Sequence, residues 1–310
     1  MPFLTPDQLT QFHENGYLVI PDYLNTSQTN ALITETNSLL SSFDLSSHPL
    51  TQFTTGDDEK DDKPHVGDDY FLNSGDKIRF FFEPDAVKDS QLTRPKEEAV
   101  NKIGHALHDP TLNKPFSEVT LSSRNADIAR DLGFRDPRVL QSMVILKQPG
   151  IGGAVPPHRD SEFLYTSPPS AVGFWIALQD ARVGNATLGF YPGSHRKVSG
   201  GIKRRFVRRY NASGEVCGTE FVGNEGAQYP KDLQVEEDGD AGLGEPDVVD
   251  IKAGSLVLIH GNVLHKSEKN TGDKSRFAYT FHVIEGASGW EYDRRNWLQP
   301  PAGGFSRLFQ

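Results

Sequence analysis

Apolar residues are spaced differently in the two halves of the chain. Up to about residue 135 they recur mainly at three- and four-residue intervals, as on one face of an amphipathic helix. From Val139 onward they form short runs bounded by turn residues, which is typical of buried strands. We therefore expect a helical layer over 1–135 and a β core over 136–310.

The N-terminal layer carries clear helix signals. Thr5, Pro6 and Gln8 have the pattern of a capping box, so a helix is expected to begin at Pro6 and to end near Gly16. Further helices are expected over about 26–40, over 95–107, and over about 116–132 with Gly133 as the C-cap. Short strands are expected over 17–20 and 78–82, and residues 41–68 are interpreted as a polar loop or lid.

The C-terminal part predicts a β fold. Strands are expected over 139–146, 173–178, 188–191, 255–260 and 277–282. Several short strands joined by turns indicate a closed or sandwiched arrangement such as a jelly roll or a cupin. Residues 200–250 are interpreted as an irregular insertion that is acidic and rich in glycine over 236–247. Since no repeat and no clear linker interrupts the chain, we expect one domain over 1–310.

Composition excludes some classes of function. The 310 residues carry a net charge of -10, and the basic residues gather only near 203–209, so nucleic-acid binding is not expected. No apolar run approaches the roughly 20 residues of a membrane helix, and the N-terminus does not resemble a signal peptide. The single cysteine, Cys217, fits a reducing compartment. We expect a cytoplasmic protein, whose oligomeric state stays open.

Two histidine motifs suggest a metal site. His158 and Asp160 are two positions apart in an extended segment, so their side chains point to the same side. His260 or His265, after a buried strand, supplies a third ligand in this interpretation; the alternative is that both cap the strand end. Two histidines and one carboxylate with open positions are the ligand set of non-haem Fe(II) oxygenases. His195, in the turn 192–195, is interpreted as structural.

Arg276 has a position that suits a cosubstrate. It stands eleven residues after His265, at the start of the next expected strand. A guanidinium holds a carboxylate through a planar, bidentate contact, so Arg276 is a candidate for the far end of a dicarboxylate. A serine hydrolase is not indicated, because the sequence has no Gly-x-Ser-x-Gly elbow.

Longer stretches make a family resemblance specific. Together with the histidine motifs and Arg276, the chain resembles the phytanoyl-CoA dioxygenase family at 69–72, 74–83, 101–108, 191–195, 258–261, 265–267 and 297–300. The resemblance implies a double-stranded β-helix with an N-terminal helical layer. It implies that His158, Asp160 and His265 bind iron and that Arg276 holds 2-oxoglutarate; preferring His265 over His260 rests on it. It also implies that the cosubstrate pocket is lined by Lys102, Met143, Trp175 and Ser267.

The expected function is that of an Fe(II)- and 2-oxoglutarate-dependent dioxygenase. Such an enzyme would use O2 to oxidise an unactivated C–H bond of a small-molecule or acyl substrate, releasing succinate and CO2, with ascorbate in support. Because histidine binds metal only when neutral, activity should fall below about pH 6. The alternative is a cupin-type hydrolase or isomerase that uses Zn(II) in the same site. Arg276 and Lys102 count against that alternative, since a hydrolase needs no dicarboxylate clamp.

Overall fold

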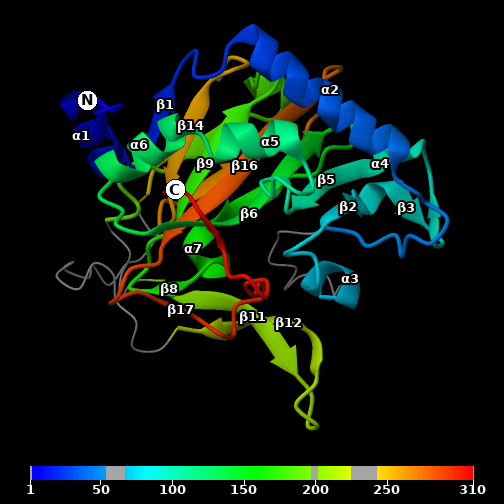
Figure 1. Ribbon diagram of the computed structural model, residues 1–310. Helices are drawn as coiled ribbons and strands as arrows, with labels where there is room; N and C mark the ends of the chain where they lie inside the picture. The colour runs from blue at the N-terminus through cyan, green and yellow to red at the C-terminus, as the bar shows by residue number, and fades with distance from the viewer. Residues whose placement is uncertain (1, 54–66, 197–201, 225–242, 310) are drawn as a thin grey trace.

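Two antiparallel β-sheets enclose an inner cluster of apolar side chains, and helices cover the outer face of the larger sheet (Figure 1). The computed structural model describes residues 2–53, 67–196, 202–224 and 243–309. The expectation of a double-stranded β-helix with flanking helices is confirmed. Within the described residues, no helix is both long enough and apolar enough to cross a membrane.

The larger sheet has eight strands in the order β1-β14-β9-β16-β6-β5-β2, with β18 also paired to β6. Its central strands are buried on both faces, because helices cover one face and the smaller sheet covers the other. The bounds are β1 Tyr17–Ile20, β2 Ile78–Phe82, β5 Val100–His105, β6 Pro137–Lys147, β9 Val172–Ala177, β14 Leu256–His260, β16 Arg276–Glu285 and β18 Ser306–Arg307.

The smaller sheet has four short strands in the order β13-β10-β15-β7. These are β7 Val155–His158, β10 Leu188–Phe190, β13 Asp247–Val248 and β15 His265–Ser267. Three separate pairs complete the strands: β3 Val87–Lys88 with β4 Gln91–Leu92, β8 Thr166–Ser167 with β17 Glu291–Tyr292, and β11 Arg204–Tyr210 with β12 Val216–Gly223. The β11–β12 hairpin lies on the opposite side of the sheets from α2 (Figure 1).

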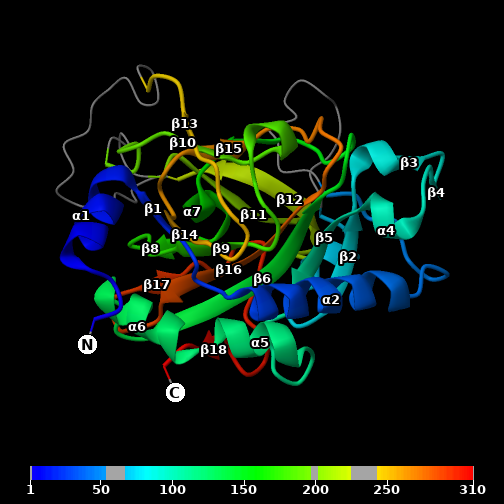
Figure 2. The ribbon, with the colours of Figure 1, turned by 90° about the horizontal axis from the view of Figure 1, so that it is seen from above.

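Helices α2 and α5 lie side by side along the larger sheet (Figures 1 and 2). Leu32 of α2, Phe116 of α5 and Ile128 of α6 belong to the same buried cluster as the outward-facing side chains of β6 and β16. The expected capping box of α1 is confirmed, with Gln8 N–H donating to Thr5 Oγ1 at 3.2 Å. The bounds are α1 Pro6–Asn15, α2 Thr26–Ser42, α3 Asp69–Leu72, α4 Lys96–Ala99, α5 Lys114–Thr120, α6 Ser123–Asp131 and α7 Asp160–Phe163.

The helix expected over 95–107 is wrong. The helical part is the single turn α4, and the chain then continues as β5 between β2 and β6. A strand buried on both faces has apolar residues at irregular spacing, and this spacing imitates a helix over a short window. The helical layer over 1–135 is therefore interrupted, because β1, β2 and β5 from this part belong to the larger sheet.

Two other expected segments also differ from the structure. The helix over 116–132 is two helices, because the Ser122 side chain caps a new helix by accepting from Asn125 N–H. Gly133 does follow that helix with a φ of +88°. The 200–250 segment is not wholly irregular, since it contains the β11–β12 hairpin, with Cys217 in β12. The acidic stretch within 41–68 and most of 236–247 lie outside the described residues.

The pleat of the larger sheet selects which side chains face inward. In β6 the inward positions are Gln141, Met143, Ile145 and Lys147, and across the ladder in β16 they pair with His282, Thr280, Ala278 and Arg276 in turn. These cross-strand pairs form successive rungs along the inner face of the sheet. The His282 rung lies at one end and the Arg276 rung at the other, so the strands carry different chemistry at their two ends.

Candidate functional site

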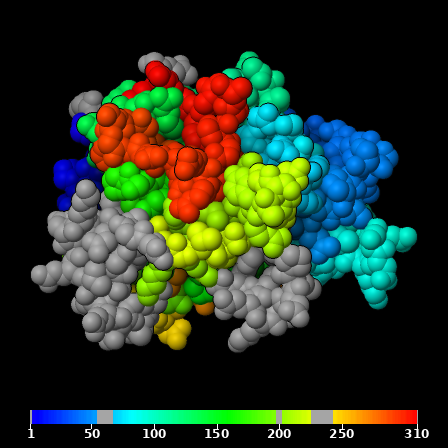
Figure 3. Space-filling model, turned by 90° about the horizontal axis from the view of Figure 1, so that it is seen from below, coloured from blue at the N-terminus to red at the C-terminus, as the bar shows by residue number. Residues whose placement is uncertain are grey.

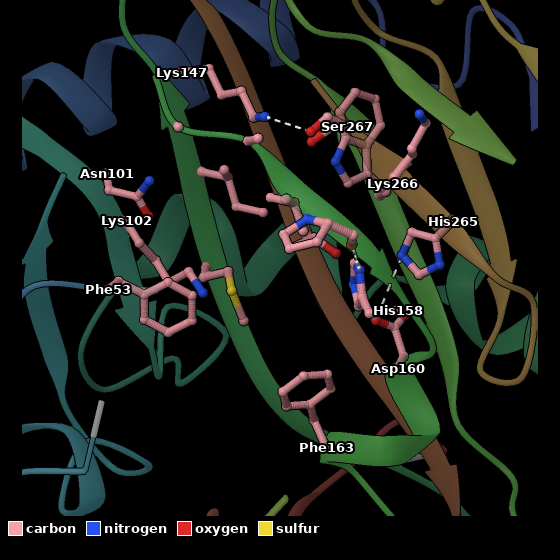
Figure 4. Close-up of a pocket in the computed structure, with 18 of the residues that line it drawn as sticks. Phe53, Asn101, Lys102, Lys147, His158, Asp160, Phe163, His265, Lys266 and Ser267 are labelled. Atoms are coloured by element: carbon pink, nitrogen blue, oxygen red, sulfur yellow. Dashed lines mark hydrogen bonds and ion pairs between the residues drawn. The ribbon is translucent and has the colours of Figure 1, made fainter. Parts of the chain in front are cut away.

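A cavity of about 400 Å³ lies between the two sheets. In Figure 4 Lys147 and Ser267 lie at one end and Phe163 at the other. The described residues that line this cavity include all eight candidates from the sequence: Lys102, Met143, His158, Asp160, Trp175, His265, Ser267 and Arg276. Residues far apart in the chain are thus brought to one place by the facing sheets.

His158, Asp160 and His265 form the one three-residue cluster of potential metal ligands found within the described ranges, with ligand atoms within 4.8 Å of one another. His158 ends β7, Asp160 begins α7, and His265 is the register partner of His158 in β15. Asp160 Oδ1 lies 3.6 Å from His158 Nε2 and 3.8 Å from His265 Nε2. One ion with bonds of about 2.1 Å spans atoms up to about 4.2 Å apart, so these spacings fit a shared metal ion.

Backbone carbonyls orient both histidine rings. His158 Nδ1–H donates to Pro156 O at 2.9 Å, and His265 Nδ1–H donates to Val263 O at 3.1 Å. Each Nε2 then carries a lone pair directed toward Asp160, which is the tautomer that a metal ion requires. Burial lowers the pKa of His265 to about 4, so this ring is neutral.

The charge of Asp160 shapes the rest of the cluster. Burial disfavours the carboxylate, but His282, His265 and His158 hold the pKa of Asp160 well below its usual range. Burial also opposes protonation of His158, but the hydrogen bond and charge of Asp160 outweigh it and raise the pKa of His158. The protein without metal thus keeps an anionic Asp160 between imidazoles.

Sequence reasoning missed His282, which contacts the other carboxylate oxygen. His282 Nε2 lies 3.3 Å from Asp160 Oδ2. On its other side, Gln141 Nε2–H donates to His282 Nδ1 at 3.4 Å, so Nδ1 is the acceptor and Nε2 carries the proton given to Asp160. Gly173 leaves room for this contact, because a Cβ there would lie 3.2 Å from Asp160 Oδ2.

Two buried basic side chains form the opposite end of the cavity. Arg276 and Lys147 are register partners, and each is 1% exposed. Arg276 Nε and Nη2 donate to Ala186 O at 3.1 and 2.9 Å, and its guanidinium carbon lies 5.5 Å from the centre of the Trp175 ring. Lys147 Nζ donates to the carbonyl oxygens of Ser267 and Glu268 at 3.4 and 2.6 Å.

Arg276 and Lys147 form no ion pair within the described residues, although Glu83 and Glu268 attract a proton on Lys147 from outside ion-pair distance. Across the residues that the structure describes, no carboxylate lies within ion-pair distance of Arg276 or Lys147. Burial, together with the Arg276 charge, lowers the pKa of Lys147 to about 6, and burial lowers the pKa of Arg276 to about 9. Because a buried charge is costly without a counter-charge, this end of the cavity is suited to an anion.

Lys102 faces the metal-ligand cluster from across the cavity (Figure 4). It is 7% exposed in β5, and its ammonium lies 3.2 Å from the centre of the Phe53 ring. Burial lowers the pKa of Lys102 to about 7, against the attraction of Asp160. Met143 lies on the rung between the two ends, next to Thr280, which in turn pairs with Trp175 on its other side.

His260, His195 and Arg159 do not line this cavity. His260 Nδ1 accepts from Asn262 N–H at 3.1 Å, and His195 Nε2–H donates to His13 O at 3.0 Å. Both therefore have the local structural contacts that the sequence suggested. Arg159 is buried and donates from Nε to Asn262 O at 3.1 Å, so its side chain does not compete for the metal-ligand cluster.

A simple signal was available for the missed residues. Arg276 and His282 are six positions apart in one strand, so a period of two places them on the same face. Lys147 is four positions from Met143 and follows the same rule, but the expected strand stopped at Leu146. Extending both strands and marking alternate polar positions would have identified Gln141, Lys147 and His282.

Comparisons with known proteins agree with this geometry. The chain matches the phytanoyl-CoA dioxygenase (PhyH) family over residues 12–278. It is 44% identical over 302 residues to phytanoyl-CoA dioxygenase domain-containing protein 1 of Bos taurus, covering 97% of this chain and 96% of that one. The chain belongs to the phytanoyl-CoA dioxygenase family. It is accordingly an enzyme of the Fe(II)- and 2-oxoglutarate-dependent dioxygenase class.

Solved structures of other proteins have the same fold as this chain. The non-haem α-ketoglutarate-dependent carbocyclase SnoK from nogalamycin biosynthesis aligns with a TM-score of 0.58 at 17% identity, covering 92% of this chain and 86% of that chain. EctD from S. alaskensis with bound Fe aligns with a TM-score of 0.56 at 17% identity, covering 92% and 78%. At these identities the likeness concerns the fold, while residue roles rest on the site described above.

Proposed function

We propose that His158, Asp160 and His265 bind Fe(II), and that Arg276 and Lys147 bind the far carboxylate of 2-oxoglutarate. We further propose that the enzyme oxidises a C–H bond of a small molecule with release of succinate and CO2. The observation that carries the proposal is a buried Arg276 guanidinium beside the buried Lys147 amine. Neither forms an ion pair with a carboxylate in the described structure, and both lie at the far end of a cavity that contains the metal-ligand cluster. A dicarboxylate supplies that missing anion.

The chain's own residues prepare this chemistry in separate ways. When bound, iron supplies the reaction of O2 with 2-oxoglutarate that gives succinate and CO2 and oxidises the substrate. The Pro156 and Val263 carbonyls hold both imidazole Nε2 lone pairs ready for the ion. His282 fixes the Asp160 carboxylate by a hydrogen bond to Oδ2.

Other residues position the cosubstrate. Arg276 is held in place by Ala186 O, and the Trp175 ring lies against its guanidinium, so little side-chain freedom is lost on binding an anion. Lys102, Met143 and Ser267 line the space between this end and the metal-ligand cluster. We propose that they contact the body of 2-oxoglutarate and keep water from it.

The test is 2-oxoglutarate turnover without a second substrate. Purified protein receives Fe(II), ascorbate, O2 and 2-oxoglutarate, and succinate is followed with time. His265→Ala should abolish succinate formation, whereas His260→Ala, its matched control at the end of β14, should retain it. Arg276→Ala should require about 10- to 100-fold more 2-oxoglutarate, as expected for loss of a charge-assisted hydrogen bond.

A binding measurement covers the case in which turnover requires substrate. 2-Oxoglutarate is titrated calorimetrically into the Fe(II)-loaded protein without O2. If it does not bind, the dioxygenase assignment of this site is wrong, and a cupin-type hydrolase using the same three ligands becomes the better interpretation. The buried basic side chains Arg276 and Lys147, which form no ion pair in the described ranges, count against that alternative, because hydrolysis requires no anion at this end.

A further inference from the structure

The cavity continues past the metal-ligand cluster into a region walled by rings. Phe163 of α7 lies 5.4 Å from Phe206 and 5.7 Å from Phe221, measured between ring centres, and its ring is 6.0 Å from that of His158. Phe71 and Trp297 are stacked at 4.3 Å. We call this end the aromatic chamber, lined by Phe71, Phe163, Leu164, Phe206, Phe221 and Trp297. Figure 4 places Phe163 at the opposite end from Lys147, with His158 and Asp160 between them.

The arginines near the aromatic chamber are engaged by the protein. Arg204 Nε pairs with Glu162 Oε2 at 3.0 Å, and Arg205 pairs with Asp293. Arg208 donates to Trp297 O and Leu72 O at 2.8 and 2.9 Å. None of these three arginines is among the described residues that line the cavity.

These contacts give the arginines a structural role. The contacts of Arg205 and Arg208 fasten the β11–β12 hairpin to the C-terminal segment, and that of Arg204 fastens it to α7. Figure 3 shows the hairpin (yellow-green) beside the C-terminal segment (red). The idea that they serve the phosphates of an acyl-CoA therefore gains no support from the described contacts. The chamber itself is faced by rings and an aliphatic side chain.

Gln141 brings an unsatisfied polar atom to this end of the cavity. Gln141 is 6% exposed and lines the cavity on the rung next to Asp160. Its Nε2 donates to His282, but its Oε1 is buried and has no hydrogen-bond partner in the structure. A buried acceptor without a partner is unfavourable, and a ligand that brings a hydroxyl or N–H group removes that cost.

We infer that the aromatic chamber binds the substrate to be oxidised, and that this substrate presents an uncharged, ring-bearing apolar group with a hydrogen-bond donor for Gln141. The inference rests on the proposed function, because it assigns the cationic end to 2-oxoglutarate and leaves the aromatic end for the substrate. Ring walls favour flat apolar groups through burial and stacking. They disfavour a charged group, which would lose its hydration beside the six described side chains of the chamber, none of which is charged.

The first test uses the unmodified protein and three matched probes. 2-Naphthol, 2-methoxynaphthalene and 2-naphthalenesulfonate share one ring system but differ in donor and charge. Each is titrated calorimetrically into protein loaded with Fe(II) and 2-oxoglutarate without O2. 2-Naphthol should bind at least about tenfold more tightly than either of the others. Equal or tighter binding of the sulfonate, or no binding of 2-naphthol, would overturn the inference.

Variants then locate the binding site. Phe221→Asp places a charge in the chamber and should weaken 2-naphthol binding at least about tenfold. Tyr210→Asp is the matched control, since Tyr210 is a 48% exposed aromatic residue on the other strand of the same hairpin. It should leave 2-naphthol binding unchanged. Gln141→Leu should remove the preference for 2-naphthol over 2-methoxynaphthalene. Equal effects of the two aspartate variants would show that the probe binds elsewhere.

The same samples separate the two proposals. 2-Oxoglutarate binding is measured before each probe is added. If 2-oxoglutarate fails to bind, the proposed function is wrong and the substrate inference fails with it. If 2-oxoglutarate binds while the three naphthalenes do not discriminate, the proposed function stands and the inference about the aromatic chamber alone is wrong.

Discussion

His282 should tune metal binding although it is not a metal ligand. Its hydrogen bond to Asp160 Oδ2 at 3.3 Å holds the carboxylate so that Oδ1 faces His158 and His265. His282→Leu removes the Nε2–H donor and puts an apolar side chain of similar size in its place. Asp160 Oδ2 then either rotates toward the metal or stays without a hydrogen bond. His282→Gln keeps an N–H donor on a side chain of similar reach.

The size of the effect follows from the interaction lost. A hydrogen bond to a charged group contributes about 1.5–3 kcal/mol, which corresponds to about 10- to 150-fold in a binding constant. In the variant, bound metal partly compensates the carboxylate for the lost hydrogen bond, so we expect a loss of affinity in the lower half of that range. Removing groups that orient metal ligands typically lowers metal affinity by roughly 10- to 100-fold. His282→Leu should therefore weaken Co(II) binding by about 10- to 50-fold.

The assay combines Co(II) calorimetry with the visible absorption spectrum of the Co(II)-loaded protein. The spectrum should change in His282→Leu, because carboxylate coordination changes, and should be largely restored in His282→Gln. Gln141→Leu loosens His282 without removing it and should give a smaller loss of affinity. Thermal unfolding of each variant controls for damage to the fold. Wild-type affinity in His282→Leu, or equal loss in both His282 variants, would refute the positioning role.

Three further outcomes follow from the same site. Lys147 has a pKa of about 6 without an anion, so 2-oxoglutarate binding at pH 8 should be accompanied by proton uptake. The affinity for 2-oxoglutarate should therefore rise as the pH is lowered. Calorimetry in buffers of different ionisation enthalpy measures this uptake, and finding none would contradict the prediction. Since Asp160 raises the pKa of His158 above its usual 6.5, protons compete at Nε2 and Co(II) affinity should fall as the pH drops through this region; a flat titration between pH 5 and 8 counts against the assignment. Gly173→Ala should weaken Co(II) binding and lower stability by about 1–3 kcal/mol, because its Cβ would crowd Asp160 Oδ2 at 3.2 Å. Gly184→Ala, where no heavy atom lies within 4 Å, is its control and should bind Co(II) normally.

The sequence alone was sufficient for the class of fold and for naming candidate residues that the structure brings together. Strand periodicity from Val139 onward predicted the sheets, and the spacing of His158 and Asp160 predicted two ligands on one side. These features are local, because two residues separated by one position in an extended chain share a side whatever surrounds them. The choice of His265 over His260 required the family resemblance, since both follow the same strand.

Tertiary structure decided what local spacing leaves undetermined. Residues 100–105 have apolar positions that fit a short helix or a buried strand equally well, and the pairing of β5 between β2 and β6 settles the matter. Lys147 and Arg276 are more than a hundred positions apart in the sequence. The register of β6 and β16 buries them side by side, without a carboxylate partner among the described residues. The aromatic chamber likewise combines α3, α7, the β11–β12 hairpin and Trp297. The residues taken one at a time do not predict these features. Charge compensation and the walls of a cavity depend on side chains that come into contact only after the sheets have formed.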